Sequence, residues 1–307
     1  MVNTFEFARY RFQFRTVEAV HFPQGKSSNT LRGAFGMLLR ESAPADVYAR
    51  LFEPGLPVGR APSGLSDWPR PYLFRAAHLD GLTVSADGRF YFDVHVFDLR
   101  ESVLESIRAA FEGWAETGVG PRRGRVQLER AEQLGLDDRA TTEPCRLQFE
   151  AAAEPVEHVR LRFLTPTELK AGGAVAERPE FAALFGRLRD RISTLRAFYG
   201  PGPLQIDFRG MGERAAAIRL SHCDLERRSV ARKSGRTGQV HPLGGFTGTA
   251  DYAGDLREFL PWLRAARWVG VGRHTAWGNG DVRVVIPREA SEPDPRASRG
   301  GPEASSQ

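Results

Sequence analysis

The sequence predicts an α+β protein that contains the same folding unit twice. The tripeptide at 118–120, Gly-Val-Gly, recurs at 270–272, each time after an amphipathic helical stretch and before basic residues and a strand. Apolar residues in both halves alternate between strand spacing and helix spacing in the order βαββαβ. A repeat of this kind implies two copies of one unit. We therefore expect tandem ferredoxin-like (βαββαβ, RRM-like) domains with antiparallel sheets and a C-terminal glycine-rich loop.

The first half supplies these elements in order. Tyr10 to Val20 begins by alternating aromatic and basic side chains, which predicts a half-buried strand. A loop broken by Pro23 and Gly25 leads to a helix at 31–39, and the proline- and glycine-rich stretch 42–70 predicts a long excursion. The remaining expected elements are strands at 72–76 and 90–99, a helix at 103–114 and a strand after Gly120. In the strand at 90–99, Tyr91, Asp93 and His95 share the face opposite the apolar one.

The second half repeats the pattern. Its expected elements are a strand at 158–164, a helix at 181–195, strands at 204–208 and 215–220, a helix with apolar residues at 256, 259, 260 and 263, and a strand at 282–286. We place the domains at 1–150 and 151–287. Residues 288–307 contain almost no apolar side chains and are expected to be a disordered tail.

Composition narrows the class of protein. With 307 residues, 41% hydrophobic and 10% aromatic, the chain has room for two globular domains. The chain has 43 Lys and Arg residues against 38 Asp and Glu, a net charge of +5. So small an excess points to an anionic partner only where the basic residues cluster. The two cysteines, Cys145 and Cys223, are too few for a disulfide framework or a metal cluster. Without a signal peptide or a long apolar run, a soluble, cytoplasmic protein with no membrane contact is expected.

The glycine-rich loop at 270–280 is the strongest local signal. Gly270, Gly272, Gly278 and Gly280 permit positive φ and close backbone approach, so exposed N–H groups can form an anion-binding nest. Arg273 and His274 add donors there. The loop lacks the Gly-Lys-Ser/Thr of a nucleotide P-loop, and its strand follows the loop where a P-loop's strand precedes it. The alternative is a long turn with solvated charges.

A second basic cluster lies between Cys223 and Gly244. It contains Arg227, Arg228, Arg232, Lys233 and Arg236, spaced by small residues. This spacing is typical of a mobile arm that follows a phosphate backbone. The alternative is a solvated hairpin tip without a partner.

Six stretches resemble a known family. They are TLRGAFG, RPYLFRA, LRFLTPTELKAGG, RISTLRAFYG, GGFTGTADYAGDL and GVGRHTAWGNGDV, and they occur in family order from about Tyr10 to Ile286. Together they are similar to the CRISPR-associated endoribonucleases that process precursor CRISPR RNA, of the RAMP (repeat-associated mysterious protein) superfamily. The resemblance implies a ribonuclease that cuts each CRISPR repeat once by 2′-hydroxyl attack. It leaves a 2′,3′-cyclic phosphate and a 5′-hydroxyl, without metal or cofactor.

Such a cleavage needs a proton acceptor, a proton donor and a fixed positive charge. The resemblance places the catalytic histidine in the loop after the first strand, where His21 lies, with Lys26 in the same loop as the stabilising cation. In the alternative, His21 continues the strand and packs beside Phe22. His241, after the basic arm, is the second candidate. The first helix has no histidine, although some family members place theirs there.

The expected RNA contacts are cationic. They are Arg32, the first-copy loop residues Arg122, Arg123 and Arg125, the arm residues Arg232, Lys233 and Arg236, and Arg273 with His274. The implied partner is CRISPR repeat RNA in precursor transcripts, with a CRISPR effector complex and a homodimer as further candidates. Two other functions compete. One is a non-catalytic RAMP subunit that holds guide RNA, and the other is a small-molecule enzyme, for which no motif argues.

Overall fold

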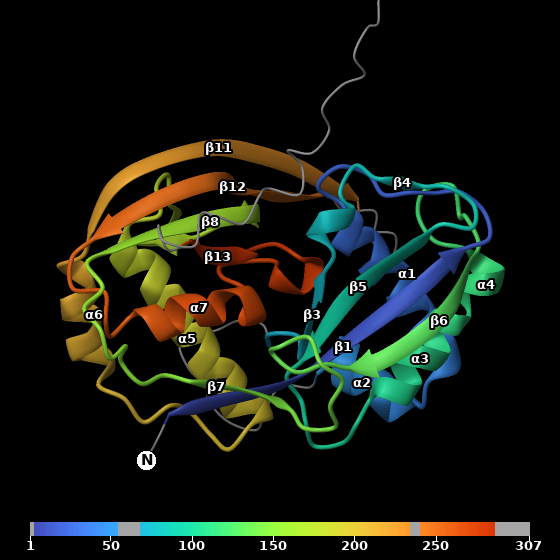
Figure 1. Cartoon of the computed structure of the whole chain (residues 1–307), viewed down its shortest axis with the longest axis horizontal. Coiled ribbons are helices and arrows are strands. Elements are labelled where there is room, and N and C mark those ends of the chain that lie inside the picture. Colours follow the sequence, from blue (N-terminus) through green and yellow to red (C-terminus); the bar gives the residue numbers. More distant parts are fainter. Residues whose placement is uncertain (1–2, 55–67, 234–239, 286–307) are drawn as a thin grey trace, which may run out of the picture.

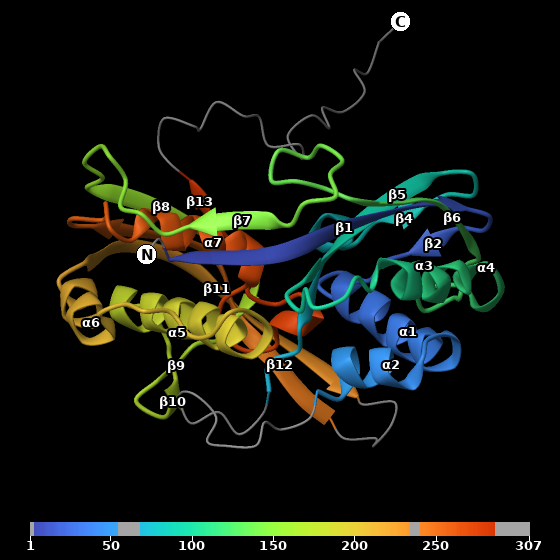
Figure 2. The same ribbon diagram turned by 90° about the horizontal axis from the view of Figure 1, so that it is seen from below.

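The N-terminal half is one antiparallel sheet with helices on one face (Figures 1 and 2). The computed structural model describes residues 3–54, 68–233 and 240–285, with backbone alone at 171, 229–233 and 240–243. The sheet has the order β3-β5-β1-β6. Its strands are β1 (Thr4–Thr16), β3 (Tyr72–Arg75), β5 (Arg89–Val96) and β6 (Val126–Gln133), and its helices are α1 (Ser27–Ser42), α2 (Ala45–Phe52), α3 (Leu104–Glu112) and α4 (Trp114–Thr117).

The C-terminal half has the same topology. Its sheet, in the order β11-β12-β8-β13, contains β8 (His158–Thr167), β11 (Arg219–Lys233), β12 (Val240–Ala253) and β13 (Val282–Val285). Its helices are α5 (Phe181–Tyr199), α6 (Phe208–Ala216) and α7 (Leu260–Val269). In both sheets the second strand of the unit lies beside the third, then the first, then the fourth. The expected tandem ferredoxin-like fold with antiparallel sheets is confirmed.

Smaller elements connect these units. The pair β2 (Val20–His21) and β4 (Thr83–Val84) lies at one end of the N-terminal half, and β9 (Lys170–Ala171) pairs with β10 (Ala174–Val175) in the other half. Two short 3₁₀ helices are η2 (Ala77–Leu79) and η3 (Thr275–Trp277). No described helix combines the length and the apolar character that crossing a lipid bilayer requires.

The two Gly-Val-Gly tripeptides have the same conformation. Gly118 ends α4 and Gly270 ends α7, with φ of 67° and 75°. The following valine in each copy donates its N–H to a glycine carbonyl further along, Val119 to Gly124 at 2.9 Å and Val271 to Gly280 at 3.0 Å. The loop closed by this hydrogen bond is longer in the second copy, and η3 lies within the additional residues. The repeat seen in the sequence is therefore a structural repeat, with an insertion in the second copy.

Three sequence expectations were wrong. Residues 204–208 are not a strand, and 215–220 is strand only from Arg219, because Asp207 caps α6 by accepting the N–H of Gly210 at 2.8 Å. The basic arm was expected to be mobile, but its residues up to Lys233 belong to β11, which pairs with β12 from Val240 onward in a long hairpin. Of the arm's cations, only Arg227 and Arg228 have described side chains, and both are exposed, so this part of the strand shows no one-sided apolar pattern. The excursion at 42–70 contains α2, and the tail at 288–307 lies outside the described residues.

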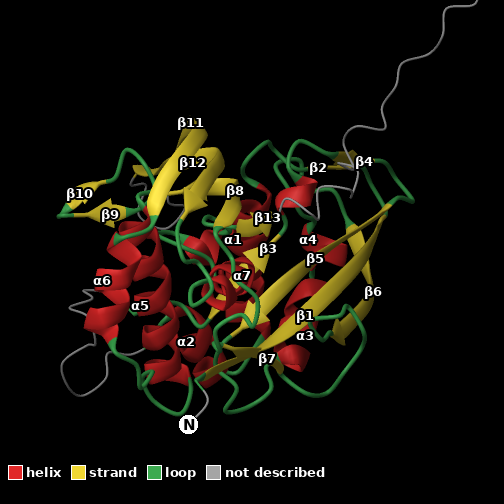
Figure 3. Ribbon diagram, turned by 60° about the vertical axis from the view of Figure 1, so that its left-hand side comes forward, coloured by secondary structure: helices red, strands yellow, loops and turns green. Residues whose placement is uncertain are grey.

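The first strand belongs to both halves. Ala8 to Arg15 pair with β5, whereas Thr4 to Phe7 pair with β7 (Cys145–Gln148) close to the N-terminus (Figure 3). Phe5 and Phe7 are buried in the core of the C-terminal half, while Phe12 and Phe14 are buried in that of the N-terminal half. The first strand therefore contributes side chains to the cores of both halves.

Candidate nucleic-acid interface

The glycine-rich loop docks against the first helix of the other half. A Cβ atom on Gly278 would lie 2.2 Å from Cβ of Ser28, in the first turn of α1. The carbonyl of Gly278 accepts from the hydroxyl of Thr165 at 2.9 Å, and that hydroxyl also accepts the N–H of Asp281 at 2.9 Å. Only glycine permits this approach, because a side chain would occupy the space of Ser28.

Flat side chains gather where the loop meets α1. The ring of His274 stacks on Trp277 with centroids 4.6 Å apart and an interplanar angle of 6°. The guanidinium of Arg32 lies 5.6 Å from the Trp277 ring centroid and 5.3 Å from that of Phe52. The structure thus brings together two predicted RNA-binding residues, Arg32 and His274, around the half-buried Trp277.

Arg273 holds the loop to the end of β8. Its Nη1 lies 2.6 Å from Oε1 of the buried Glu168, and the Arg273 N–H donates to the Glu168 carbonyl at 3.1 Å. This carboxylate compensates much of the arginine's charge. Arg273 therefore has a positioning role in addition to any contact with a ligand.

The first-copy loop lies beside β2. A Cβ on Gly120 would be 3.0 Å from the carbonyl oxygen of His21, so loop and strand are in direct contact. Arg122 and Arg123 are exposed, whereas Arg125 pairs with Glu18 at 2.8 Å. That bond and charge lower the pKa of Glu18. Arg122 and Arg123 therefore offer the more available charge.

His21 is exposed and oriented. Its Nδ1 lies 3.0 Å from the hydroxyl of Thr83 on the paired strand β4. The next residue, Phe22, is fully buried, so the two side chains lie in different environments and His21 does not pack beside Phe22 in the core. Lys26 is exposed immediately before α1, at its N-cap. Both candidates are accessible to a ligand.

The hairpin candidates are described only in part. Arg232 lies opposite His241 in the β11–β12 ladder, and Lys233 lies opposite Val240. The side chains of these residues, and Arg236 altogether, lie outside what the structure describes.

A basic cavity separates the open face of the N-terminal sheet from α7. It encloses about 300 Å³ and is lined by Arg9, Arg11, Arg75, His78, Tyr91, Asp93, His95, Asp138, Arg267, Trp268 and Arg283. Arg9 and Arg11 pair with Asp93 at 2.6 and 2.7 Å. Burial alone would raise the pKa of Asp93, but the hydrogen bond from Arg11 and the charges of both arginines lower it overall. This carboxylate is therefore ionised and already neutralised.

His95 forms the floor of this cavity. Its Nδ1 lies 2.8 Å from the carbonyl of Trp268 at the end of α7. Burial, helped by the charge of Arg75, lowers the pKa of His95 to about 3. The ring is neutral at pH 7, so Nδ1 carries the proton that it donates to this carbonyl. The geometry therefore gives His95 a structural role.

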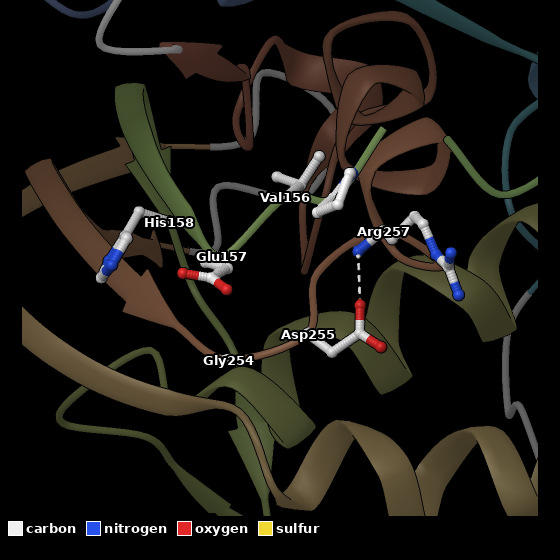
Figure 4. A pocket seen from close by; sticks show the side chains of 7 residues that line it. Val156, Glu157, His158, Gly254, Asp255 and Arg257 are labelled. Atoms are coloured by element: carbon white, nitrogen blue, oxygen red, sulfur yellow. Dashed lines mark hydrogen bonds between the residues drawn. The ribbon is translucent and has the colours of Figure 1, made fainter. Parts of the chain in front are cut away.

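A larger pocket lies at the start of β8, at the end of the C-terminal sheet opposite the glycine-rich loop. Figure 4 shows side chains that line it. It encloses about 580 Å³ and is lined by Pro155, Val156, Glu157, His158, Gly254, Asp255 and Arg257. Asp255 accepts the backbone N–H of Arg257 at 3.3 Å. Two carboxylates in its wall disfavour a polyanion, so size does not make it the nucleic-acid site.

The cavity contains charged residues that sequence reasoning did not single out. Arg75 and Arg267 were overlooked because neither belongs to a cluster of cations: Arg75 is the one cation of β3, and Arg267 shares the largely apolar α7 only with Arg264. The signal that was available is the polar face of β5, where Tyr91, Asp93 and His95 alternate with buried residues. Within the described ranges, no three His, Cys, Asp or Glu side chains are grouped as a metal site would require.

Comparisons with known proteins agree with this architecture. Residues 161–282 match the family model described as CRISPR-associated endoribonuclease Cas6, and residues 5–145 match a model described as an N-terminal domain. No curated protein sequence matches the chain significantly.

Solved structures match along nearly the whole chain. The Cas6 (TTHB231) product complex is 17% identical, covers 91% of this chain and 99% of its own, and has a TM-score of 0.57. The Cas6 (TTHA0078) product complex is 19% identical, with coverages of 92% and 100% and a TM-score of 0.54. Thermus thermophilus Cas6 (TTHB231) is 16% identical, with coverages of 91% and 98% and a TM-score of 0.53. The solved structures show that the chain has a Cas6-like fold, and residues 161–282 match the Cas6 family of CRISPR-associated endoribonucleases.

Proposed function

We propose that the protein is a metal-independent endoribonuclease that cuts CRISPR repeat RNA in precursor transcripts to give guide RNAs. The observation that carries this proposal is the glycine-rich loop docked on the start of α1, with Arg32, His274 and Trp277 gathered at the junction. A cation and flat rings suit phosphates and unpaired bases. The match of residues 161–282 to the Cas6 family model supports RNA as the ligand.

The proposed reaction is attack of a 2′-hydroxyl on the adjacent phosphorus. A base removes the 2′ proton, the bond to the 5′ oxygen breaks, and an acid protonates that oxygen, leaving a 2′,3′-cyclic phosphate and a 5′-hydroxyl. His21 is the proposed acid or base, since its Nδ1 is held by Thr83 and its ring remains exposed. Lys26 would stabilise the charge that develops on the phosphorane.

Binding would be distributed over several cationic positions. Arg32, Arg122, Arg123, Arg125, Arg232, Lys233, Arg236, Arg273 and His274 are the proposed contacts. Phosphate contacts hold RNA in register without reading its sequence. We further propose that the protein acts in the cytoplasm, and that a homodimer or a CRISPR effector complex is its assembled form. Light scattering during gel filtration, with and without RNA, tests the homodimer.

The second candidate is a non-catalytic subunit that holds guide RNA. The paired Gly-Val-Gly loops suit binding alone as well as catalysis, because their backbone recognises phosphate in either case. The exposed and oriented His21 favours the enzyme.

Labelled repeat RNA incubated with the protein in EDTA separates the two functions. A single cut ending in a cyclic phosphate supports the enzyme, and a gel shift without cutting supports the binding subunit. His21→Ala should slow cleavage by about 10²- to 10⁴-fold, the usual contribution of a general acid or base. His158→Ala, an exposed histidine at the distant pocket, is the matched control and should cleave normally. If His21→Ala and His241→Ala both retain full activity, the assignment is wrong.

Salt dependence tests the hairpin. Replacing Arg232, Lys233 and Arg236 together by Ala should reduce the slope of log K against log[salt] by up to about 2, since each lost phosphate contact removes roughly 0.7 for a single strand. Arg209→Ala in α6, an exposed arginine paired with Glu213, is the control and should leave the slope unchanged. An unchanged slope in the triple variant would show that the hairpin tip does not touch the backbone.

A further inference from the structure

The open face of the N-terminal sheet carries an exposed aromatic side chain. Along β5, Tyr91, Asp93 and His95 share the face that α1 and α3 do not cover. His95 is buried under the end of α7, but Tyr91 is 41% exposed. The end of α7 covers this face only as far as the basic cavity, and Tyr91 lies on the rim of that cavity.

Three flat groups are stacked at that rim. The rings of His78 and Tyr91 lie 4.7 Å apart at 29°, and Nε2 of His78 lies 2.9 Å from the Tyr91 carbonyl oxygen. On β1, Arg11 places its guanidinium 4.4 Å from the Tyr91 ring centroid. Asp93 holds Arg11 in this position through two hydrogen bonds, at 2.7 and 3.1 Å. The stack is therefore rigid before any ligand arrives, as a nucleobase platform needs to be.

The charges around the stack do not balance. Among the described residues that line the cavity, five are arginines and two are aspartates. Asp93 and Asp138 each pair with both Arg9 and Arg11, at distances of 2.6 to 3.2 Å. No lining carboxylate is left for the other three arginines.

Those three arginines lack strong anionic partners. Arg75 donates from Nε to the carbonyl of Arg267 at 2.8 Å, but its two terminal nitrogens have no acceptor among the described residues. Arg267 lies over the Trp268 ring at 4.3 Å, and Arg283 is 3.7 Å from its nearest carboxylate, Asp281. Withdrawal from water is the main cause that lowers the pKa of Arg75 and of Arg267. The charge of Asp281 opposes this shift, and the charge of Arg283 adds to it. An anion bound between the arginines would relieve their repulsion.

We propose that this face binds one unpaired nucleotide of the substrate RNA, with its base on the His78–Tyr91–Arg11 stack and its phosphate between Arg267 and Arg283. Both of these arginines are exposed and can reach a ligand. The inference rests on the proposed function, because RNA is the polyanion in question. The proposed site would contact a base directly. The phosphate contacts proposed at the glycine-rich loop do not provide such a contact. None of the candidate catalytic residues lines this cavity.

The test uses single-stranded repeat RNA that carries a 2′-deoxy nucleotide at the cleavage position and 2-aminopurine at each position in turn. The wild-type protein should quench the fluorescence at one unpaired position. Tyr91→Ala should abolish that quenching and weaken binding by roughly five- to a hundredfold, since stacking on one base contributes about 1–3 kcal/mol. Tyr91→Phe keeps the ring and should bind within about twofold of wild type. Arg283→Ala should weaken binding and lower its salt dependence, whereas Arg209→Ala should not.

Other outcomes would overturn the proposal. If no position is quenched, or if Tyr91→Ala binds as tightly as wild type, the stack is not a base platform. If a fully paired duplex of the same sequence loses as much affinity on Tyr91→Ala, the contact does not involve an unpaired base. Inorganic phosphate that displaces the oligonucleotide from wild type more readily than from Arg283→Ala supports the phosphate position. Because the oligonucleotide cannot be cut, binding is scored separately from cleavage. If the wild-type protein binds cleavable repeat RNA but never cuts it, only the proposed endoribonuclease activity is contradicted, and the proposed nucleotide site is not.

Discussion

His95 shows how one side chain joins the two halves at the scale of a residue. It comes from β5 in the N-terminal sheet and donates to the last turn of α7 in the C-terminal half, where the ring also lies 5.5 Å from that of Trp268. Arg75 and Arg191 donate to the neighbouring carbonyls of Arg267 and Val269, at 2.8 and 2.7 Å. The end of α7 therefore has three side-chain donors for three successive carbonyls, which otherwise lack intrahelical partners.

Burial of His95 makes stability depend on pH. The folded protein keeps the ring neutral down to a pKa of about 3, whereas the unfolded chain binds a proton below about 6.5. The unfolded state then binds more protons, so the free energy of unfolding falls as pH falls through that interval. Between pH 7 and 5 this residue should account for a loss of about 2 kcal/mol. Urea unfolding of wild type and His95→Asn at both pH values measures it, and equal losses in the two proteins would contradict it.

The sequence places His95 on a strand but does not show what this side chain contacts. The alternation in β5 predicts only that His95 shares a face with Tyr91 and Asp93. Its covering by α7 depends on how two halves far apart in sequence dock, and no local pattern records that contact. His21 was predicted from its place in the loop after the first strand together with the family resemblance, and its catalytic role stays a prediction.

At the scale of elements, the glycine-rich loop shows what repetition predicts and what it does not. The matching tripeptides predicted the shared turn, and both copies adopt it with positive φ at each glycine. The insertion that carries η3 has no counterpart in the first copy, so its docking on Ser28 could not be inferred from the repeat. The β11–β12 hairpin was missed for a different reason. Phe246, Ala250 and Tyr252 of β12 are buried, but glycines in β12 and clustered arginines in β11 interrupt the alternation that would reveal a strand.

Gly278→Ala should undock the loop. Its φ of 88° disfavours a side chain, and the added Cβ would overlap Ser28, so a loss of at least about 1–3 kcal/mol in the free energy of unfolding is expected. RNA cleavage should fall with it. Gly186→Ala in α5 meets nothing within 4 Å and should stabilise by roughly 0.5–1 kcal/mol.

A double variant separates the two causes. Adding Ser28→Gly to Gly278→Ala removes the steric overlap and leaves the backbone strain, so part of the stability should return. Chemical denaturation of the four proteins in this cycle measures the coupling. If the two substitutions are additive, the loop does not pack on α1 as described.

At the scale of the whole molecule, β1 is the strand that prevents the two halves from acting as separate domains. Phe7 is fully buried, with its ring 5.6 Å from Trp268, and Nε of Arg196 on α5 donates to the carbonyl of Thr4 at 3.0 Å. A boundary near residue 150 describes the order of the two units along the chain. It does not describe independent cores, because the first residues of the N-terminal unit fill the interior of the second.

This sharing predicts a single cooperative transition. Phe7→Ala should cost about 3–5 kcal/mol and lower the hydrogen-exchange protection of the slowest amides in α5 and α7 as much as in β5. Phe14→Ala, whose ring packs only within the N-terminal core on Phe90, Phe92, Phe111 and Trp114, is the comparison. If the protein unfolds as one cooperative unit, Phe14→Ala also lowers the hydrogen-exchange protection of α5 and α7. If Phe14→Ala leaves those helices fully protected, the halves unfold independently. The basic cavity between them, where an RNA nucleotide is proposed to bind, could then open without unfolding either half.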